Sequence, residues 1–561
     1  MAAIEQSRNW SVTEDRRQEI LSQSIGVYEN AIHCHIQRGH LSQALEIVER
    51  VRSKRLVELM GTGDLYQSGE VPETIREILR RLDTTQQQLQ TATQKQLVTT
   101  GPTRSRVATA ESAELSDAIK ALEAERKDLR NQLAKLDPIA SGFQDVQPLA
   151  LDDMQSLVDN PKTALLSLYI TDNGTHIFIL RQTGTEVFTI PDQGKKELAV
   201  WLVKNWLQPY AERSTGEWLA QMPKVLAELS DRLQLNDLIQ QHLTDITDLI
   251  LIPHLLLHQI PFAALPLSET ELLGDRFTLR YAPGCQVLKI CSDRQQETTP
   301  AATPTYGIVE NATNDLPCSA YEGQQLAQTL AVPSDRHLQG PAATAIAYRQ
   351  LLKNCTSIVS THHAQHRLDN PLESHLLLGN GDRITLGQLL LPTWRFPDLD
   401  EVFLSCCETS FTFTGKPIDD VLTLGTGFLC AGANSIIGTL WSVDDLATAL
   451  FSLQYHHHRQ TGSDRPTALR QAQNHLRQLT GKTFQAKYAP ALKQHLEGEF
   501  DRLCDLLDQA EAEGDSNRAK DLNNAAAKTE RILANLEKYG KQDHPFAHPF
   551  YWAGFTCQGL R

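Results

Sequence analysis

Two short strings of this chain carry side chains that could perform nucleophilic chemistry. Thr361-His362-His363-Ala364-Gln365-His366 supplies imidazoles, and Leu404-Ser405-Cys406-Cys407-Glu408-Thr409 supplies thiols. A thiol becomes a strong nucleophile when it loses its proton, and a neighbouring imidazole is a base that can accept that proton. His362 and Cys407 are therefore a candidate base and nucleophile, if the fold brings the two strings together.

Both strings stand at the end of a short apolar, β-branched run. Ser357-Ile358-Val359-Ser360 precedes the first string, and Glu401-Val402-Phe403-Leu404 leads into the second. Such runs are typical of short buried strands. The chain between them is long enough for a crossover that connects parallel neighbours. If the strands are adjacent, His362 and Cys407 emerge side by side at the carboxyl edge of an α/β sheet, where such folds place their sites.

Other residues in the same strings offer alternatives. His366 and His363 are the alternative bases. Cys406 points to the opposite face if its strand continues, so we interpret it as structural. His362 and His366 could bind zinc together on a helix, but the β-branched run before them favours a strand. Without the second string, a cysteine at a strand end is most often a small buried hydrophobe.

Composition excludes several classes of protein. The 53 Lys and Arg residues against 68 Asp and Glu give a net charge of −15, which argues against nonspecific binding of nucleic acid. Ten cysteines without a CxxC pair argue against a disulfide scaffold and a zinc ribbon. The N-terminus lacks an apolar signal-like region, and no apolar stretch reaches bilayer length. We expect a cytoplasmic protein that does not bind membranes, in a reducing compartment where a catalytic thiol survives.

The first part of the chain is predicted to be all α-helical. In residues 1–70 the small and apolar positions around the turn Gly39-His40 resemble one unit of a tetratricopeptide (TPR) array, with an ordinary helical hairpin as the alternative. A single unit cannot bury its own apolar face, so it must pack on another part of the chain. Residues 71–147 predict a coiled-coil hairpin that is interrupted at Gly101-Pro102. Such a hairpin is typical of a spacer or a docking arm.

From about Pro148 the pattern changes to α/β. Two apolar runs around Asp172-Asn173-Gly174 predict a β-hairpin, and the polar stretch Ser292–Pro304 predicts a linker. Strand-like runs then alternate with helical stretches, beginning at Tyr306, Ser357, Val402 and Ser435. This alternation favours a mostly parallel sheet. Residues 485–542 predict a second helical hairpin, inserted before a terminal strand at Phe550–Phe555.

A series of strings resembles the CHAT family in the order in which they occur. They are Leu251-Ile252-Pro253, Ile260-Pro261-Phe262-Ala263-Ala264-Leu265, Asn370-Pro371-Leu372-Glu373-Ser374, the Cys407 string, Ala431-Gly432-Ala433, Leu440-Trp441-Ser442-Val443-Asp444-Asp445 and His548-Pro549-Phe550-Tyr551-Trp552-Ala553. CHAT domains are caspase-like modules usually coupled to TPR repeats, and are similar to separase. The resemblance implies an α/β caspase-like fold, with a mostly parallel sheet flanked by helices. It also implies a degenerate caspase-like half at 148–295 and a catalytic half at 300–561, behind the N-terminal TPR-like and coiled-coil region.

The resemblance further implies a cysteine peptidase with a His–Cys dyad, which requires no metal or other cofactor. The family's histidine motif falls on His362, and its cysteine motif falls on Cys407. Backbone N–H groups of His363 and Cys407 would then stabilise the oxyanion. His363 and Ser410 stand where the family usually has glycine, and both residues have a narrower choice of backbone conformations than glycine. The alternative function is a catalytically silent scaffold that acts through protein–protein interaction.

Two carboxylates point to the substrate. Asp444 and Asp445 end a string that continues the predicted strand at Ser435, so they should reach the same sheet edge as Cys407. Separase, which cleaves after arginine, has a similar Leu-Trp string followed by an acidic residue, and this match falls best on Asp445. A carboxylate there would pair with a basic side chain, although either aspartate could instead cap the helix that follows. We expect an endopeptidase that cleaves a protein or peptide after a basic residue, with a regulatory protein partner on its helical arms.

Overall fold

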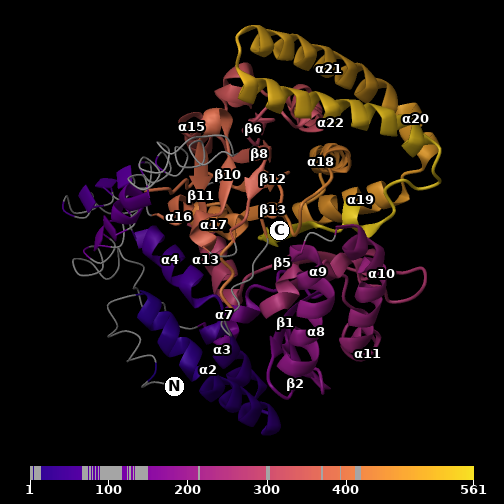
Figure 1. Cartoon of the computed structure of the whole chain (residues 1–561). Coiled ribbons are helices and arrows are strands. Elements are labelled where there is room, and N and C mark those ends of the chain that lie inside the picture. The colour runs from indigo at the N-terminus through magenta and orange to yellow at the C-terminus, as the bar shows by residue number, and fades with distance from the viewer. Residues whose placement is uncertain are drawn as a thin grey trace.

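The computed structural model describes residues 14–65, 149–212, 215–297, 303–367, 370–391, 393–410 and 419–561, together with Ile4 and isolated positions between 74 and 132 (Figure 1). Most of the predicted coiled-coil hairpin at 71–147 lies outside the described residues. The rest is a mixed α/β structure built on one large, mostly parallel sheet that helices flank, as the sequence predicts.

Eleven strands form this sheet in the order β3-β2-β1-β4-β5-β14-β13-β12-β8-β6-β7. Those of the first half are β1 (Thr163–Ile170), β2 (Gly174–Arg181), β3 (Gly184–Pro191), β4 (Asp248–Ile252) and β5 (Thr278–Tyr281). Those of the second half are β6 (Tyr306–Glu310), β7 (His337–Gln339), β8 (Ser357–Thr361), β12 (Glu401–Leu404), β13 (Ser435–Thr439) and β14 (Phe555–Gly559). The antiparallel pairing of β1 with β2 confirms the predicted β-hairpin. Because β14 pairs with both β5 and β13, the two halves share one continuous sheet.

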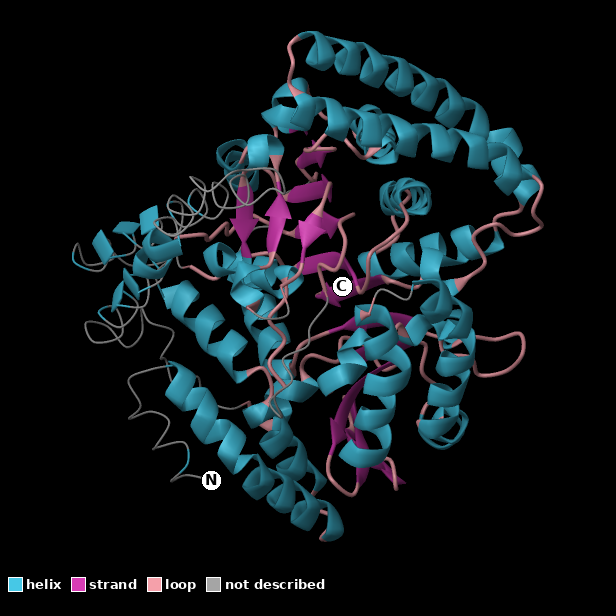
Figure 2. Cartoon of the chain, viewed as in Figure 1, coloured by secondary structure: helices cyan, strands magenta, loops and turns pink. Residues whose placement is uncertain are grey.

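Helices cover both faces of the sheet (Figure 2). One face carries α10 (Thr215–Arg232), α11 (Leu235–His242), α14 (Pro317–Thr329), α18 (Asp445–Gln460) and α19 (Arg465–Gln478). The other carries α13 (Cys285–Glu297), α15 (Ala345–Asn354), α16 (Leu386–Leu389) and α17 (Leu424–Ala431). Successive strand residues serve opposite faces: Val359 belongs to the first core and Ile358 to the second. Strands buried on both faces explain why their sequences are continuously apolar.

The N-terminal helices are part of this core. They are α2 (Glu14–Gln37), α3 (Leu41–Val51) and α4 (Lys54–Leu65), and Gly39 makes the turn between the first two with a φ of 73°. Leu45 and Val48 of α3 are buried with residues of β1 and β4, and Met60 of α4 is buried with α13. The apolar face that a single repeat could not bury alone is therefore covered by the α/β part of the chain.

Two predicted boundaries are wrong. The predicted linker at Ser292–Pro304 begins inside α13, because Arg294 is buried and donates to the carbonyl of Leu429 at 2.7 Å, which keeps the helix docked through Glu297. The predicted terminal strand at Phe550–Phe555 is a turn until Phe555, where β14 begins. Pro549 starts that turn, and the Trp441 indole holds it by donating to the Phe550 carbonyl.

The segment before β14 contains two long antiparallel helices, drawn in yellow in Figure 1. They are α21 (Ala489–Ala512) and α22 (Ser516–Gly540), preceded by the short α20 (Gly481–Lys487). Leu492 and Leu496 of α21 and Leu536 of α22 belong to the main core, whereas the distal part has a small core of its own at Leu503, Ala525 and Ala526. We call α21 and α22 the inserted hairpin.

Candidate active site

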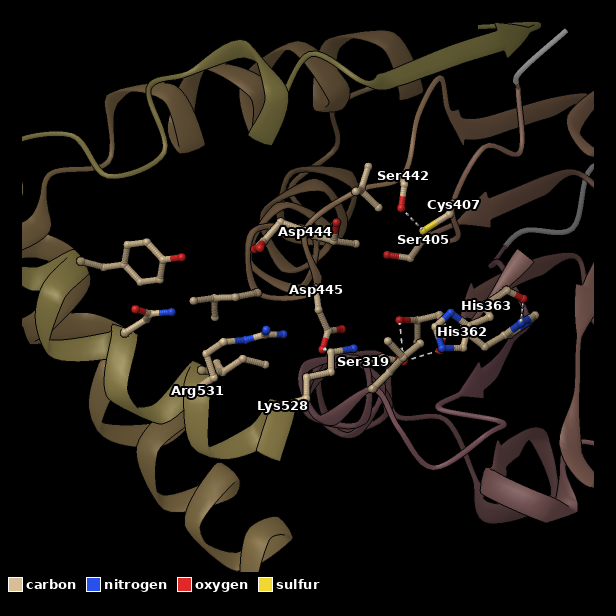
Figure 3. A pocket seen from close by; sticks show the side chains of 18 residues that line it. Ser319, His362, His363, Ser405, Cys407, Ser442, Asp444, Asp445, Lys528 and Arg531 are labelled. Carbon is tan, nitrogen blue, oxygen red and sulfur yellow. Dashed lines mark hydrogen bonds and ion pairs between the residues drawn. The ribbon is translucent and has the colours of Figure 1, made fainter. Parts of the chain in front are cut away.

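The strands that precede the two chemical strings are parallel neighbours. Leu404 of β12 lies opposite Ser360 of β8, which confirms the predicted adjacency. The chain leaves both strands at the same sheet edge, so His362 and Cys407 line one pocket of about 360 Å³ (Figure 3). Three other elements complete the pocket wall, namely the start of α18, the start of α14 and one side of α22.

His362 is buried at the end of β8, with 1% of its surface exposed. Its Nδ1 lies 3.0 Å from the carbonyl oxygen of His363, and its Nε2 has no hydrogen-bond partner among the described residues. Burial lowers the pKa of this imidazole to about 4, because a charged ring would lose its hydration. At neutral pH His362 is therefore a neutral imidazole.

Cys407 follows β12 in a tight turn and is partly exposed. The hydroxyl of Ser442 donates to its Sγ at 3.3 Å. Burial raises the pKa of the Cys407 thiol, with the hydrogen bond from Ser442 acting in the opposite direction. Among the described residues, neither Cys407 nor His362 has the other as a hydrogen-bond partner. In this state the candidate nucleophile is a protonated thiol.

A tyrosine from a helix outside the sheet stabilises the turn that carries Cys407, which we call the cysteine turn. Glu408, next to Cys407, has a φ of 56°, a conformation that is uncommon for residues other than glycine. Its carboxylate accepts a hydrogen bond from the hydroxyl of Tyr210, in α9 (Gln208–Ala211). The Tyr210 hydroxyl also accepts from the backbone N–H of Ser442 at 3.1 Å. Tyr210 thus ties together the segments on both sides of the thiol.

A buried carboxyl group of α14 joins the end of β8 to the end of β12 through hydrogen bonds. Glu322 of α14 is fully buried, and its Oε2 accepts from Thr361 at 2.8 Å and from Ser405 at 3.1 Å. Thr361 precedes His362, and Ser405 stands two residues before Cys407. Burial raises the pKa of Glu322 to about 8. The Tyr210 and Glu322 contacts were not predicted, because neither residue lies in a recognisable motif.

The alternative bases have different surroundings. His363 lines the pocket, and its Nε2 lies 3.0 Å from a carboxylate oxygen of Asp315. Burial would raise the pKa of Asp315, but the hydrogen bond and charge of His363 outweigh it and lower this pKa to about 2. His366 lies outside the pocket wall, with its Nδ1 3.2 Å from the Ser374 hydroxyl. The thiol of Cys406 is buried against the Ser360 carbonyl, 3.3 Å away.

Two backbone donors at the pocket are available. Among the described residues, the backbone N–H groups of His363 and Cys407 donate no hydrogen bond. Cys407 lies in the turn after β12, and His363 lies between β8 and β9 (Ala364–Gln365).

The two aspartates at the start of α18 have different partners. The Asp444 carboxylate is the N-cap of the helix and accepts from the backbone N–H of Ala447 at 2.9 Å. Asp445 accepts from the backbone N–H of Cys318 at 3.3 Å, and its Oδ2 lies 3.8 Å from Nζ of Lys528 in α22. Burial raises the pKa of both carboxyl groups. Both line the pocket, but helix capping already uses Asp444.

The fold and the pocket define an α/β protein with an imidazole and a thiol at one edge of its sheet. The model of the CHAT domain matches residues 215–560, and the chain belongs to this family. A comparison with curated proteins gives no match.

Similar solved structures include two crystal structures of the Saccharomyces cerevisiae separase–securin complex. The first is 12% identical with a TM-score of 0.38, over 67% of this chain and 33% of that chain. The second is 10% identical with a TM-score of 0.41, and the match covers 83% of this chain and 45% of that chain. A complex of the Porphyromonas gingivalis RgpB pro- and mature domains is 10% identical with a TM-score of 0.30, over 59% and 68%. The chain therefore spans less than half of the length of these separase chains.

Two features are absent from the described residues. None of their helices has both the length and the apolar character needed to cross a bilayer. They also contain no group of three His, Cys, Asp or Glu side chains arranged to hold a metal ion.

Proposed function

We propose that this chain is a caspase-like cysteine endopeptidase with His362 and Cys407 as its dyad. The observation that carries the proposal is the parallel pairing of β8 with β12, which brings both side chains to one pocket. Membership of the CHAT family supports the same chemistry.

The reaction begins when Cys407 loses its proton to His362 and attacks the scissile carbonyl. The resulting oxyanion accepts hydrogen bonds from the backbone N–H groups of His363 and Cys407, a contribution of roughly 3–4 kcal/mol per donor. His362 then returns the proton to the leaving amine, and water hydrolyses the thioester that remains on Cys407. Because no hydrogen bond joins Cys407 to His362 among the described residues, the two side chains must approach each other before the first step.

Asp445 gives the pocket its preference for a basic residue before the cleaved bond. Its carboxylate lines the same pocket as Cys407, and it is not the helix cap. An arginine would form a charge-assisted pair with it, worth roughly 1.5–3 kcal/mol. Substrates are protein segments, because an open pocket at a sheet edge can receive an extended chain.

Helical parts of the chain control this activity by binding a protein partner. The junction of α3 and α4 supports this role, because the backbone N–H of Ser53 donates to the Asp419 carbonyl at 2.8 Å. Asp419 is the first described residue after Ser410, which lies three positions after Cys407. A partner that moves these helices would therefore act on the segment that carries the nucleophile.

The test is cleavage of a peptide library by the full chain, with Arg, Lys, Asp or Leu before the cut. Cys407→Ala and His362→Ala should each reduce kcat/KM by at least about a thousandfold, because both members of the dyad act in the same step. Cys406→Ala and His366→Ala serve as matched controls and should keep most activity. Full turnover by Cys407→Ala would reject the dyad, and loss only in His363→Ala would move the base to that residue.

The second candidate is a catalytically silent scaffold. It is favoured by the missing hydrogen bond between Cys407 and His362, and by His363 and Ser410 in place of glycine. A peptide chloromethyl ketone that ends in arginine separates the two candidates. An enzyme should be labelled at Cys407 before the exposed Cys34, whereas a scaffold should be labelled at Cys34 first.

A further inference from the structure

The carboxylate that we assign to the substrate already has a cation beside it. Nζ of Lys528 lies 3.8 Å from Oδ2 of Asp445, and the two side chains are only 28% and 14% exposed. The same ammonium group donates to the backbone carbonyl of Asp315 at 3.1 Å. Asp315 in turn contacts His363, so Lys528 spans the pocket between Asp445 and the histidine string.

This lysine reaches the pocket from a separate element. In Figure 3, α22 approaches from the side opposite to His362 and Cys407. Ile532 and Tyr539 of the same helix also line the pocket and pack against the main core. The partner helix α21 is fixed by His495, whose Nε2 lies 3.0 Å from the carbonyl of Pro317, where α14 begins. The inserted hairpin is therefore docked on the rest of the chain through both of its helices.

A second cation follows one turn later on α22. Arg531 also lines the pocket, and it is exposed. Among the described residues it has no carboxylate within ion-pair distance. The hairpin thus faces the acidic pocket with two basic side chains, of which one is already paired.

We propose that Lys528 is a specificity-determining residue that acts as an internal ligand of Asp445. The inserted hairpin holds this lysine where the basic residue of a substrate would bind. A basic substrate residue must displace Lys528 before it can pair with Asp445, whereas a neutral residue need not. This inference rests on the proposed function, and on the assignment of Asp445 in particular.

The competition has a definite signature. Lys528 weakens the binding of basic substrates and leaves neutral ones unchanged, so it reduces the margin by which basic substrates are preferred. It contacts neither Cys407 nor His362 among the described residues, so the chemical step is not altered. Its removal should therefore lower KM for basic peptides and leave kcat unchanged.

The experiment measures peptide binding in the Cys407→Ala background, where no turnover occurs. Fluorescence anisotropy is recorded with two peptides that differ only in Arg or Leu at the position before the cut. Lys528→Met keeps the aliphatic stem and removes the charge. We expect it to tighten binding of the Arg peptide about two- to fivefold, the factor of a partly exposed ion pair. Binding of the Leu peptide should not change.

Lys520→Met is the matched control, because it removes the same charge from an exposed position on the same helix. It should leave the affinity for both peptides unchanged. A second pair of measurements uses active protein, in which Lys528→Met should lower KM for the Arg peptide at constant kcat.

The outcomes separate this inference from the proposed function. Unchanged or weaker binding of the Arg peptide to Lys528→Met would overturn the role of the lysine, and equal tightening for the Leu peptide would do the same. Asp445→Asn tests the pocket itself, since it should weaken binding of the Arg peptide only. If Asp445→Asn has this effect while Lys528→Met has none, the internal ligand is rejected and the basic pocket stands.

Discussion

At the scale of single residues, the buried imidazole of His362 should influence the stability of the protein as the pH changes. Its pKa is lowered by burial to about 4 in the folded chain, against an ordinary value of about 6.5. Between these two pH values the unfolded chain binds a proton that the folded chain does not. The contribution of His362 to the free energy of unfolding is therefore fully present above about pH 6.5, and it is lost as the pH falls towards 4.

Comparison with His362→Gln isolates this contribution from other buried histidines, such as His254 and His456, whose pKa values are also lowered by burial. Urea unfolding of both proteins between pH 7 and pH 4 should show the wild type losing more stability, by up to about 3 kcal/mol. A difference between the two proteins that does not vary with pH would contradict the buried neutral state of His362.

Residues of the site could be predicted from the sequence where a motif follows a strand. His362 and Cys407 were located because each follows a short apolar run, and the ends of parallel neighbours share an edge. Tyr210 and Lys528 could not be predicted, because their contacts depend on how helices distant in sequence dock on the sheet. The sequence predicted Asp445 at the pocket, but no motif marked Lys528 as its partner.

At the scale of elements, the indole of Trp441 joins the segment before α18 to the turn before β14. It is fully buried, lies 5.6 Å between ring centroids from Trp218, and donates to the Phe550 carbonyl at 3.1 Å. A Cβ added at Gly554 would lie 2.8 Å from Cε2 of this ring, closer than packing allows. The closing aromatic motif therefore fits Trp441 only with glycine at position 554.

Gly554→Ala should consequently destabilise the fold by about 1–3 kcal/mol, because the neighbouring ring prevents Trp441 from moving aside. The measurement is the shift of the urea midpoint. Gly498→Ala in α21 is the control, since nothing lies within 4 Å of the added atom. It should raise stability by up to about 1 kcal/mol through helix propensity. Equal midpoints for Gly554→Ala and wild type would show that the ring is free to move.

The elements themselves show what sequence patterns can resolve. Alternating apolar runs and helical stretches predicted the α/β class and the starts of β6, β8, β12 and β13. The terminal strand was misplaced because the aromatic run at Phe550–Phe555 has a high strand propensity, whereas Pro549 and two indole hydrogen bonds impose a turn. The order of strands was not predictable either, since β14 pairs with strands far away in the sequence.

At the scale of the whole molecule, Arg52 fastens the N-terminal helices to the first half of the sheet and to Asp419. Its side chain is completely buried and donates to the carbonyls of Leu168 and Pro253, at 2.5 and 2.6 Å. It also lies 3.5 Å from Glu49 and 3.9 Å from Asp419, two buried carboxylates. These contacts make the N-terminal helices an integral part of the α/β structure.

Arg52→Met should therefore destabilise the protein by about 3–5 kcal/mol, because it leaves buried carbonyls and carboxylates without their cation. Arg38→Met removes the same charge from an exposed position and should change stability by less than about 0.5 kcal/mol. Thermal unfolding of both variants provides the measurement. Similar melting temperatures for Arg52→Met and wild type would mean that the N-terminal helices are fastened by other contacts.

The place of β14 within the sheet bears on how the protein is made. During synthesis on the ribosome, residues 555–559 follow every other strand described here. Until they arrive, β5 and β13 have no neighbour on the sides that β14 later occupies, and each half-sheet carries an open edge. Tyr210 belongs to one half and Cys407 to the other, so their segments gain their shared sheet only when the last strand pairs. Until β14 pairs, the hydrogen bond from Tyr210 to the cysteine turn lacks the shared sheet beneath it, and open strand edges of this kind are prone to aggregate.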